Sequence, residues 1–161
     1  SGMYQNEIVE KFESPTNWTP GTVTEKKISV KNTGNIPMAV RASYTEKWVS
    51  ASGKELNLKD VDNNQVSIIN FGKNWTKSND GYYYYGSKEN KTVLEPTSVS
   101  TSFINSVKFN EKVNASLKES VSEDGKTITY TSTGDGYDNA TYTLIVKIET
   151  VQHDAANSFW K

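Results

Sequence analysis

The chain lacks cysteine altogether and carries a single histidine, His153, in 161 residues. The absence of cysteine excludes disulfides, thiolate metal sites and cysteine nucleophiles. A zinc site or a Ser-His-Asp triad would have to rely on His153, and neither a His-Glu-x-x-His pair nor a Gly-x-Ser-x-Gly turn occurs. We therefore expect no catalytic residue and no metal ligand, with His153 as a surface side chain, and we predict that the protein is not an enzyme.

An excess of charge of one sign and a long apolar run are also missing. The 18 basic residues nearly balance the 19 acidic ones, so no broad electrostatic field suits nucleic acid or an anionic membrane. No apolar run approaches the roughly 20 residues that a membrane helix needs. The sequence predicts no nucleic-acid partner and no membrane span. Without a signal peptide, it fits a cytosolic protein or the mature form of an exported one.

The chain is expected to form one domain. Its 161 residues are enough to bury a two-layer core, and neither an internal repeat nor a Gly/Ser linker divides them. Ser1-Gly2-Met3 is interpreted as a cloning remnant. We place a single domain at residues 4–161.

The residues that are abundant favour β-structure, since nine Tyr and four Trp accompany many Thr, Ser and Val. Segment Ile36–Val49 alternates strictly, and one face would carry Ile36, Met38, Val40, Ala42, Tyr44, Glu46 and Trp48. Segment Ala140–Val151 alternates in the same way, with Tyr142, Leu144, Val146 and Ile148 on one face. A period of two over this length predicts strands with one buried side and one wet side.

Turn residues separate these segments and suggest hairpins. We predict that Val23–Lys31 and Ile36–Val49 pair around Asn32-Thr33-Gly34-Asn35, and that Lys73–Lys77 and Tyr82–Tyr85 pair around Asp80-Gly81. About nine strand signals with short turns and no interleaved helices predict an all-β fold, a β-sandwich of jelly-roll or Ig-like topology. Gln152–Lys161 alone is expected to be helical, as a short C-terminal turn.

Two polar features are candidate sites. Glu46 interrupts an apolar face, and we expect it to lie near the sheet rim or to pair with a basic residue. Calcium remains an open alternative, with oxygen ligands in the loops containing Asp60, Asp62, Asn63, Asn64, Asp135, Asp138 and Asn139. Because backbone turns are built from the same residues, the turn interpretation is favoured and no cofactor is predicted.

Aromatic residues offer a possible ligand-stacking surface. The candidates are Trp48, Trp75, Tyr82 and Tyr84. Four consecutive tyrosines in Tyr82–Tyr85 would put one pair inward and leave the other pair exposed. Exposed tyrosines suit both polysaccharide and protein partners, so the sequence leaves these two alternatives open.

Short motifs spread over most of the chain resemble a known family. The first motifs are Trp18-x-Pro20-Gly21, then Lys27-x-x-Val30-Lys31-Asn32-Thr33-Gly34-Asn35 and Val40-Arg41. The later ones are Gly81 with Tyr82–Tyr85, then Leu94-Glu95-Pro96-Thr97, then Glu149-x-Val151-Gln152 and Trp160. Together they resemble SipW-dependent biofilm matrix proteins, the BsaA group related to TasA and camelysin. Thr97 stands where the family usually has glycine.

The resemblance implies an extracellular, jelly-roll-like structural subunit or adhesin of a Gram-positive cell-surface fibre or biofilm matrix. Its family-motif residues would be structural: Trp18, Pro20, Gly21, Lys31, Asn32, Gly34, Arg41, Trp48, Gly81, Tyr83, Tyr85, Pro96, Glu149, Gln152 and Trp160. Camelysin-like members are classed as metallopeptidases, but this chain has no zinc constellation to support that activity.

The partners expected from this resemblance are other copies of the chain or related matrix subunits, joined by strand addition at sheet edges. We expect Glu7–Phe12 to be an edge strand, the donor being Tyr4–Phe12 or a segment upstream of it, without which the chain would stay monomeric. Two alternatives remain: a carbohydrate-binding module that uses exposed Trp and Tyr, and a secreted hydrolase.

Overall fold

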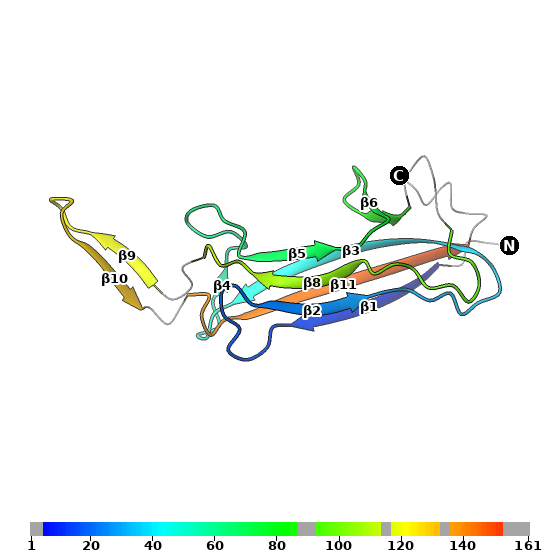
Figure 1. Cartoon of the computed structure of the whole chain (residues 1–161), viewed down its shortest axis with the longest axis horizontal. Helices are drawn as coiled ribbons and strands as arrows, with labels where there is room; N and C mark the ends of the chain where they lie inside the picture. The colour runs from blue at the N-terminus through cyan, green and yellow to red at the C-terminus, as the bar shows by residue number, and fades with distance from the viewer. Residues whose placement is uncertain (1–4, 87–92, 114–116, 133–135, 153–161) are drawn as a thin grey trace.

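The protein is an all-β sandwich with a projecting hairpin (Figure 1). The computed structural model describes residues 5–86, 93–113, 117–132 and 136–152, and no helix occurs among them. The described strands are β1 (Gln5–Glu13), β2 (Val23–Ile28), β3 (Met38–Val49), β4 (Glu55–Leu56), β5 (Ser67–Phe71), β6 (Trp75–Lys77), β7 (Tyr83–Tyr85), β8 (Ile104–Phe109), β9 (Leu117–Val121), β10 (Ile128–Ser132) and β11 (Thr141–Gln152).

The strands form two facing sheets and a separate pair. The larger sheet has the order β1-β11-β3-β7-β6, with β4 also paired to β3, and the smaller sheet has the order β2-β8-β5. All pairings are antiparallel. The predicted β-sandwich is confirmed, with six strands in one sheet and three in the other, while β9 and β10 pair only with each other among the described strands.

The core lies between the two sheets and follows the alternation of the sequence. In β11, Tyr142, Leu144, Val146 and Ile148 are buried, as predicted. In β3, Val40, Ala42 and Trp48 are fully buried on the same inner face. Phe103, Ile104, Val107 and Phe109 from the smaller sheet's side complete the core. Alternating side chains therefore supply most of the apolar surface that stabilises the fold.

The predicted hairpin of Val23–Lys31 with Ile36–Val49 is wrong. Strand β2 belongs to the smaller sheet and pairs with β8, whereas β3 belongs to the larger sheet and pairs with β11. The Asn32 side chain determines this crossing, because its Nδ2 donates to the carbonyls of Ile36 and Leu94 at 2.9 and 2.8 Å. These bonds hold the β2–β3 connection against the segment at Leu94, which is far away in the sequence. The chain therefore crosses from the smaller sheet to the larger one and does not form a hairpin within one sheet.

Trp18 anchors the connection between β1 and β2. Its buried ring lies 5.9 Å from the Trp48 ring and 5.7 Å from the Tyr142 ring, both stacked, and its Nε1 donates to Thr24 Oγ1 at 2.9 Å. Gly21 follows with φ of +92°, a conformation that favours glycine, and its N–H donates to the Phe109 carbonyl. The Trp-x-Pro-Gly motif thus turns the chain onto the smaller sheet, with Pro20 exposed at the surface of the turn.

The strand pairings also test the second predicted hairpin and the predicted C-terminal helical turn. The hairpin of β6 and β7 is confirmed, and Gly81 occupies its turn with φ of +87°. Gln152 is the last residue of β11 and lies opposite Met38, so the predicted helical turn does not begin there. The rest of that predicted turn, with His153 and Trp160, lies outside the described residues, as do Ser1-Gly2-Met3.

Candidate functional site

Strand β1 forms a free edge of the larger sheet. It pairs with β11 on one side, and among the described residues no strand pairs with its other side. The N–H of Ser14 donates to the Tyr142 carbonyl at 2.9 Å, and the register continues from this pair through the strand. Because antiparallel bonding alternates, the N–H and C=O groups of odd-numbered residues point away from β11. The outward groups belong to Gln5, Glu7, Val9, Lys11 and Glu13.

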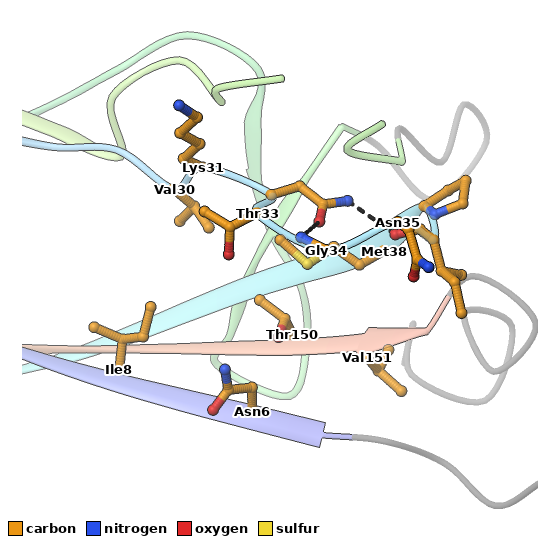
Figure 2. Close-up of a pocket in the computed structure, with 13 residues that line it drawn as sticks. Asn6, Ile8, Val30, Lys31, Thr33, Gly34, Asn35, Met38, Thr150 and Val151 are labelled. Atoms are coloured by element: carbon orange, nitrogen blue, oxygen red, sulfur yellow. Dashed lines mark hydrogen bonds between the residues drawn. The ribbon is translucent and has the colours of Figure 1, made fainter. Parts of the chain in front are cut away.

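The sandwich is open beside the first half of β1. Figure 2 shows Val30 and Thr33 on one side of a cavity, with Asn6, Ile8 and Thr150 on the other. The cavity has a volume of about 340 Å³ and continues past Gly34, Ile36, Pro37 and Met38. Ile8 lies opposite the buried Ile148 on the inner face of the sheet but is 44% exposed. Among the described residues nothing therefore covers the inner surface of β1 here, and we call this cavity the edge groove.

An ion pair crosses the opening further along β1. Lys26 Nζ on β2 lies 3.8 Å from Glu10 Oε2 on β1, which joins the edges of the two sheets. Phe12, two residues later on the same face, is buried against Trp18. The edge groove is thus confined to the part of β1 that precedes Glu10.

The outer face of the larger sheet carries a polar network formed by three of the resembled motifs. Arg41 Nη2 donates to Glu149 Oε2 at 3.2 Å, and both side chains are largely buried, 16% and 7% exposed. Arg41 also lies 3.9 Å over the Tyr82 ring and donates from Nη1 to the Tyr84 hydroxyl, which in turn donates to Asp80. Burial lowers the pKa of Arg41, but the hydrogen bonds with Tyr84 and Glu149 outweigh it and the net shift is upward. The network clamps β3, β11 and β7 together.

Another pair of motifs meets where the β2–β3 connection touches the turn at Pro96. Asn32 is buried, accepts the Gly34 N–H on Oδ1, and exchanges backbone bonds with Ser98 and Thr97. Thr97 has φ of +69°, which is strained for a β-branched residue. The glycine that the resembled family carries at this place has a physical reason, because glycine adopts this conformation freely.

The proposed stacking platform does not form. Trp48 and Tyr84 are fully buried in this chain, so neither ring is available to a ligand. Trp75 packs on Tyr85 and Phe103 toward the core, whereas Tyr82 lies over Arg41 on the outer face. The inward pair of the tyrosine run, Tyr83 and Tyr85, packs as predicted. The prediction that Tyr82 and Tyr84 are both exposed is only half right, because the outer-face network buries Tyr84.

Glu46 is hydrogen-bonded to two hydroxyl groups. Its Oε2 accepts hydrogen bonds from Ser67 Oγ at 2.7 Å and Tyr142 Oη at 2.8 Å, and these come from the two facing sheets. Burial, followed by the charge of Glu46, raises the pKa of Tyr142 far above its usual value. Of the two alternatives expected for Glu46, the described residues give it no basic partner, and two hydroxyls bond its Oε2 instead.

The loop offered for calcium is a hydrogen-bonded turn. The Asp60 carboxylate accepts the N–H groups of Asp62 and Asn64, and Asn63 adopts φ of +64°. No group of three His, Asp or Glu side chains suited to a metal ion occurs in the part of the chain that the structure describes. Asp135 of the other candidate loop lies outside the described residues. The described part of that loop, Asp138 and Asn139, forms no such group.

No protein-family model matches this chain, and no curated protein or solved structure proved similar to it. Among the described residues, the structure has no helix that is both long enough and apolar enough to span a membrane.

Sequence reasoning found the edge strand and missed the groove. Glu7–Phe12 was predicted as an edge strand, and β1 is one. The groove depends on Ile36, which the alternation assigned to the buried face although it is 49% exposed. The available signal was the turn at Asn32-Thr33-Gly34-Asn35, which ends just before Ile36 and holds it outside β3.

Proposed function

We propose that this chain is a non-catalytic structural subunit or adhesin of a Gram-positive cell-surface fibre or biofilm matrix. It acts outside the cell, and its partners are other copies of itself or related matrix subunits. The observation that carries the proposal is the free edge of β1, a nine-residue strand whose outward backbone groups have no partner strand among the described residues.

Physical chemistry favours such an edge as an assembly surface. Unpaired N–H and C=O groups in a row accept a strand from another chain, and the new backbone bonds supply affinity without any pocket for a small ligand. When the donated strand and the accepting edge are different parts of the molecule, the contact is heterologous and can propagate into a filament. The exposed Val9 and half-exposed Ile8 add apolar area to this surface.

The motifs support the same proposal in a second way. Trp18, Asn32, Arg41, Glu149 and the tyrosine strand all hold structural positions: they lie in the core, in the layer crossing and in the outer-face clamp. Residues that a chain uses to maintain a rigid sandwich suit a building block of a fibre. Possible polysaccharide binding would have to use Tyr82 or Trp75, because the other two candidate rings are buried.

Immunogold electron microscopy of the bacterium that encodes the chain tests this function. We expect gold on extracellular fibres or matrix, and loss of those fibres when the gene is deleted. Labelling confined to the cytoplasm, or fibres unchanged by the deletion, would reject the proposal. Glycan-array binding that disappears in Trp75→Ala would instead favour a carbohydrate-binding module.

A further inference from the structure

Strand β3 has a gap along the edge that faces away from β11. On this edge β7 pairs with β3 up to Ala42, and β4 pairs with it from Trp48 onward. Between these two pairings, no described strand lies beside residues 43–47. The larger sheet is therefore interrupted within a row that two strands share, both of them antiparallel to β3.

The unpartnered backbone groups of this gap belong to Tyr44 and Glu46. Even-numbered residues of β3 direct their N–H and C=O groups away from β11, as Met38 does when it exchanges backbone bonds with Leu94. On that side, neither Tyr44 nor Glu46 has a backbone hydrogen bond to any residue that the structure describes. Two donors and two acceptors thus alternate in the order that an extended peptide backbone satisfies.

A cavity of about 490 Å³ opens at this gap. Its lining residues are Ser43, Tyr44, Thr45, Glu46, Leu58, Lys77, Gly81 and Tyr83. Gly81 lies in the turn that leads away from β7, and Leu58 follows β4, where its carbonyl accepts the Val66 N–H. These two residues bound the gap along the strand direction, so it has room for an extended segment of about three residues, opposite positions 44–46.

Two side chains of opposite charge lie at the two ends of the gap. Lys77 lies opposite Tyr83 in the β6–β7 register, and its Nζ is 5.9 Å from the centre of the Tyr83 ring. Since Tyr83 pairs with Ala42, this ammonium marks the end next to β7, and within the described residues it forms no ion pair. At the other end the Glu46 carboxylate is fixed through Oε2, while its Oε1 accepts no hydrogen bond from a described residue.

We propose that this gap binds the C-terminus of an extended peptide, whose backbone pairs antiparallel with β3 at Tyr44 and Glu46. A peptide in this direction ends beside β7, where Lys77 compensates its terminal carboxylate and the turn at Gly81 blocks a longer chain. The peptide residue opposite Glu46 is basic, because cross-strand pairs of opposite charge are favourable. The contact is separate from the free edge of β1 and does not depend on assembly of copies.

Amide NMR spectra of the protein, titrated with the peptide acetyl-Thr-Lys-Thr-Val as its free acid, test the proposal. We expect the amide signals of Tyr44 and Glu46 to shift and those of β1 to stay unchanged. The same peptide with a C-terminal amide should bind about fivefold more weakly, as for the loss of one exposed ion pair. Lys77→Met should abolish this difference between the two peptides. The matched control Lys73→Met should keep it, because Lys73 is exposed and does not line the cavity.

Unchanged Tyr44 and Glu46 signals at millimolar peptide would overturn the proposal, and so would equal binding of the acid and the amide to the natural protein. Sodium acetate is a further control, because the same shifts with acetate would mean that the site holds a small anion and adds no strand. A peptide with glutamate in place of its lysine should bind the natural protein more weakly, but bind Glu46→Gln as well as the original peptide does. Equal weakening in both proteins would reject the antiparallel direction.

Discussion

At the scale of single residues, the strain at Thr97 is the clearest departure from an ideal sequence. Its φ of +69° forces a β-branched side chain into the left-handed region, at an exposed turn beside Pro96. This conformation costs an L-residue about 1–2 kcal/mol. A glycine at position 97 would avoid that cost, but it would also raise the conformational entropy of the unfolded chain, which offsets part of the stabilisation. The turn persists because Thr97 N–H donates to the Asn32 carbonyl at 2.8 Å.

We expect Thr97→Gly to stabilise the protein by up to about 1 kcal/mol, because relief of the strain exceeds the added unfolded-state entropy. Urea unfolding measures the change as a higher midpoint with an unchanged slope. The matched control is Asn63→Gly, at φ of +64°, where asparagine already tolerates the conformation and the gain should be smaller. An equal gain at both positions, or a loss at Thr97, would contradict the strain argument.

Ionisation of the Tyr44 phenol makes the free energy of unfolding depend on pH in the alkaline range. Burial raises its pKa to about 12, with smaller contributions from Tyr83 and Glu46, against about 10 in the unfolded chain. A group with a raised folded pKa keeps its proton longer in the folded state, so its stabilisation is complete below pH 10 and is lost as pH rises through 12.

The free energy of unfolding should therefore fall between pH 10 and 12, and fall less in Tyr44→Phe. Urea titrations at pH 8 and pH 11 compare the two proteins. The same pH-dependent loss in both would show that the Tyr44 phenol has no part in it.

At the scale of elements, β3 and β11 account for most of what the sequence could predict. Their period of two fixed which side chains are buried, since an inner face must be apolar whichever sheet it belongs to. The same logic cannot say which sheet a strand joins. The segments Val23–Lys31 and Ile36–Val49 each alternate and flank a good turn sequence, yet Asn32 bonds to the distant Leu94 carbonyl and places them in different layers.

The candidate site was predictable in part for a related reason. The edge position of β1 was expected from the family resemblance, and the residue pattern of Glu7–Phe12 by itself indicated only a short strand. The groove and the outer-face clamp depend on contacts between residues far apart in sequence, such as Arg41 with Glu149. Tyr84 shows the limit: alternation put it on the wet face, and the Arg41 network buries it there.

The clamp between β3 and β11 should be a major source of stability. In Arg41→Met the Glu149 carboxylate stays buried without its guanidinium partner, and we expect a loss of about 3 kcal/mol in the urea-derived free energy of unfolding. The control Lys147→Met removes the exposed pair with Glu7 on the same sheet face, which should cost less than about 1 kcal/mol. Equal losses would mean that burial of the pair does not matter.

The β9–β10 hairpin should open far more easily than the central strands. Its amides depend on one pairing and no covering layer, whereas β11 lies between two paired strands. In the monomer we expect amide hydrogens of β9 and β10 to exchange quickly and those of β3 and β11 slowly. Hairpin protection that is already high in the monomer would contradict this view of an uncovered arm.

At the scale of the whole molecule, the sandwich separates a stable interior from unsatisfied surfaces. Trp18 stacks on both Trp48 and Tyr142 in the core, and Gly72 allows the chain to cross closely past Ser102, whose carbonyl would lie 1.6 Å from an added Cβ. The start of β1 and the edge groove lie at one end of the long axis, and the β9–β10 hairpin projects from the other (Figure 1). This polarity suits a subunit that repeats along a line.

The most direct test of the central claim is the self-association of the mature protein carrying Val9→Pro. The Val9 N–H points away from β11, so proline there leaves the β1–β11 ladder intact and removes a donor that an added strand would use. Val9→Ala is the matched control, because it shortens the same side chain and keeps the N–H.

Sedimentation velocity and negative-stain electron microscopy should show filaments or large oligomers for the natural protein and for Val9→Ala. The Val9→Pro protein should remain a folded monomer, with a urea midpoint close to that of the natural chain. Filaments formed equally well by folded Val9→Pro would contradict the claim that copies join at the free edge of β1.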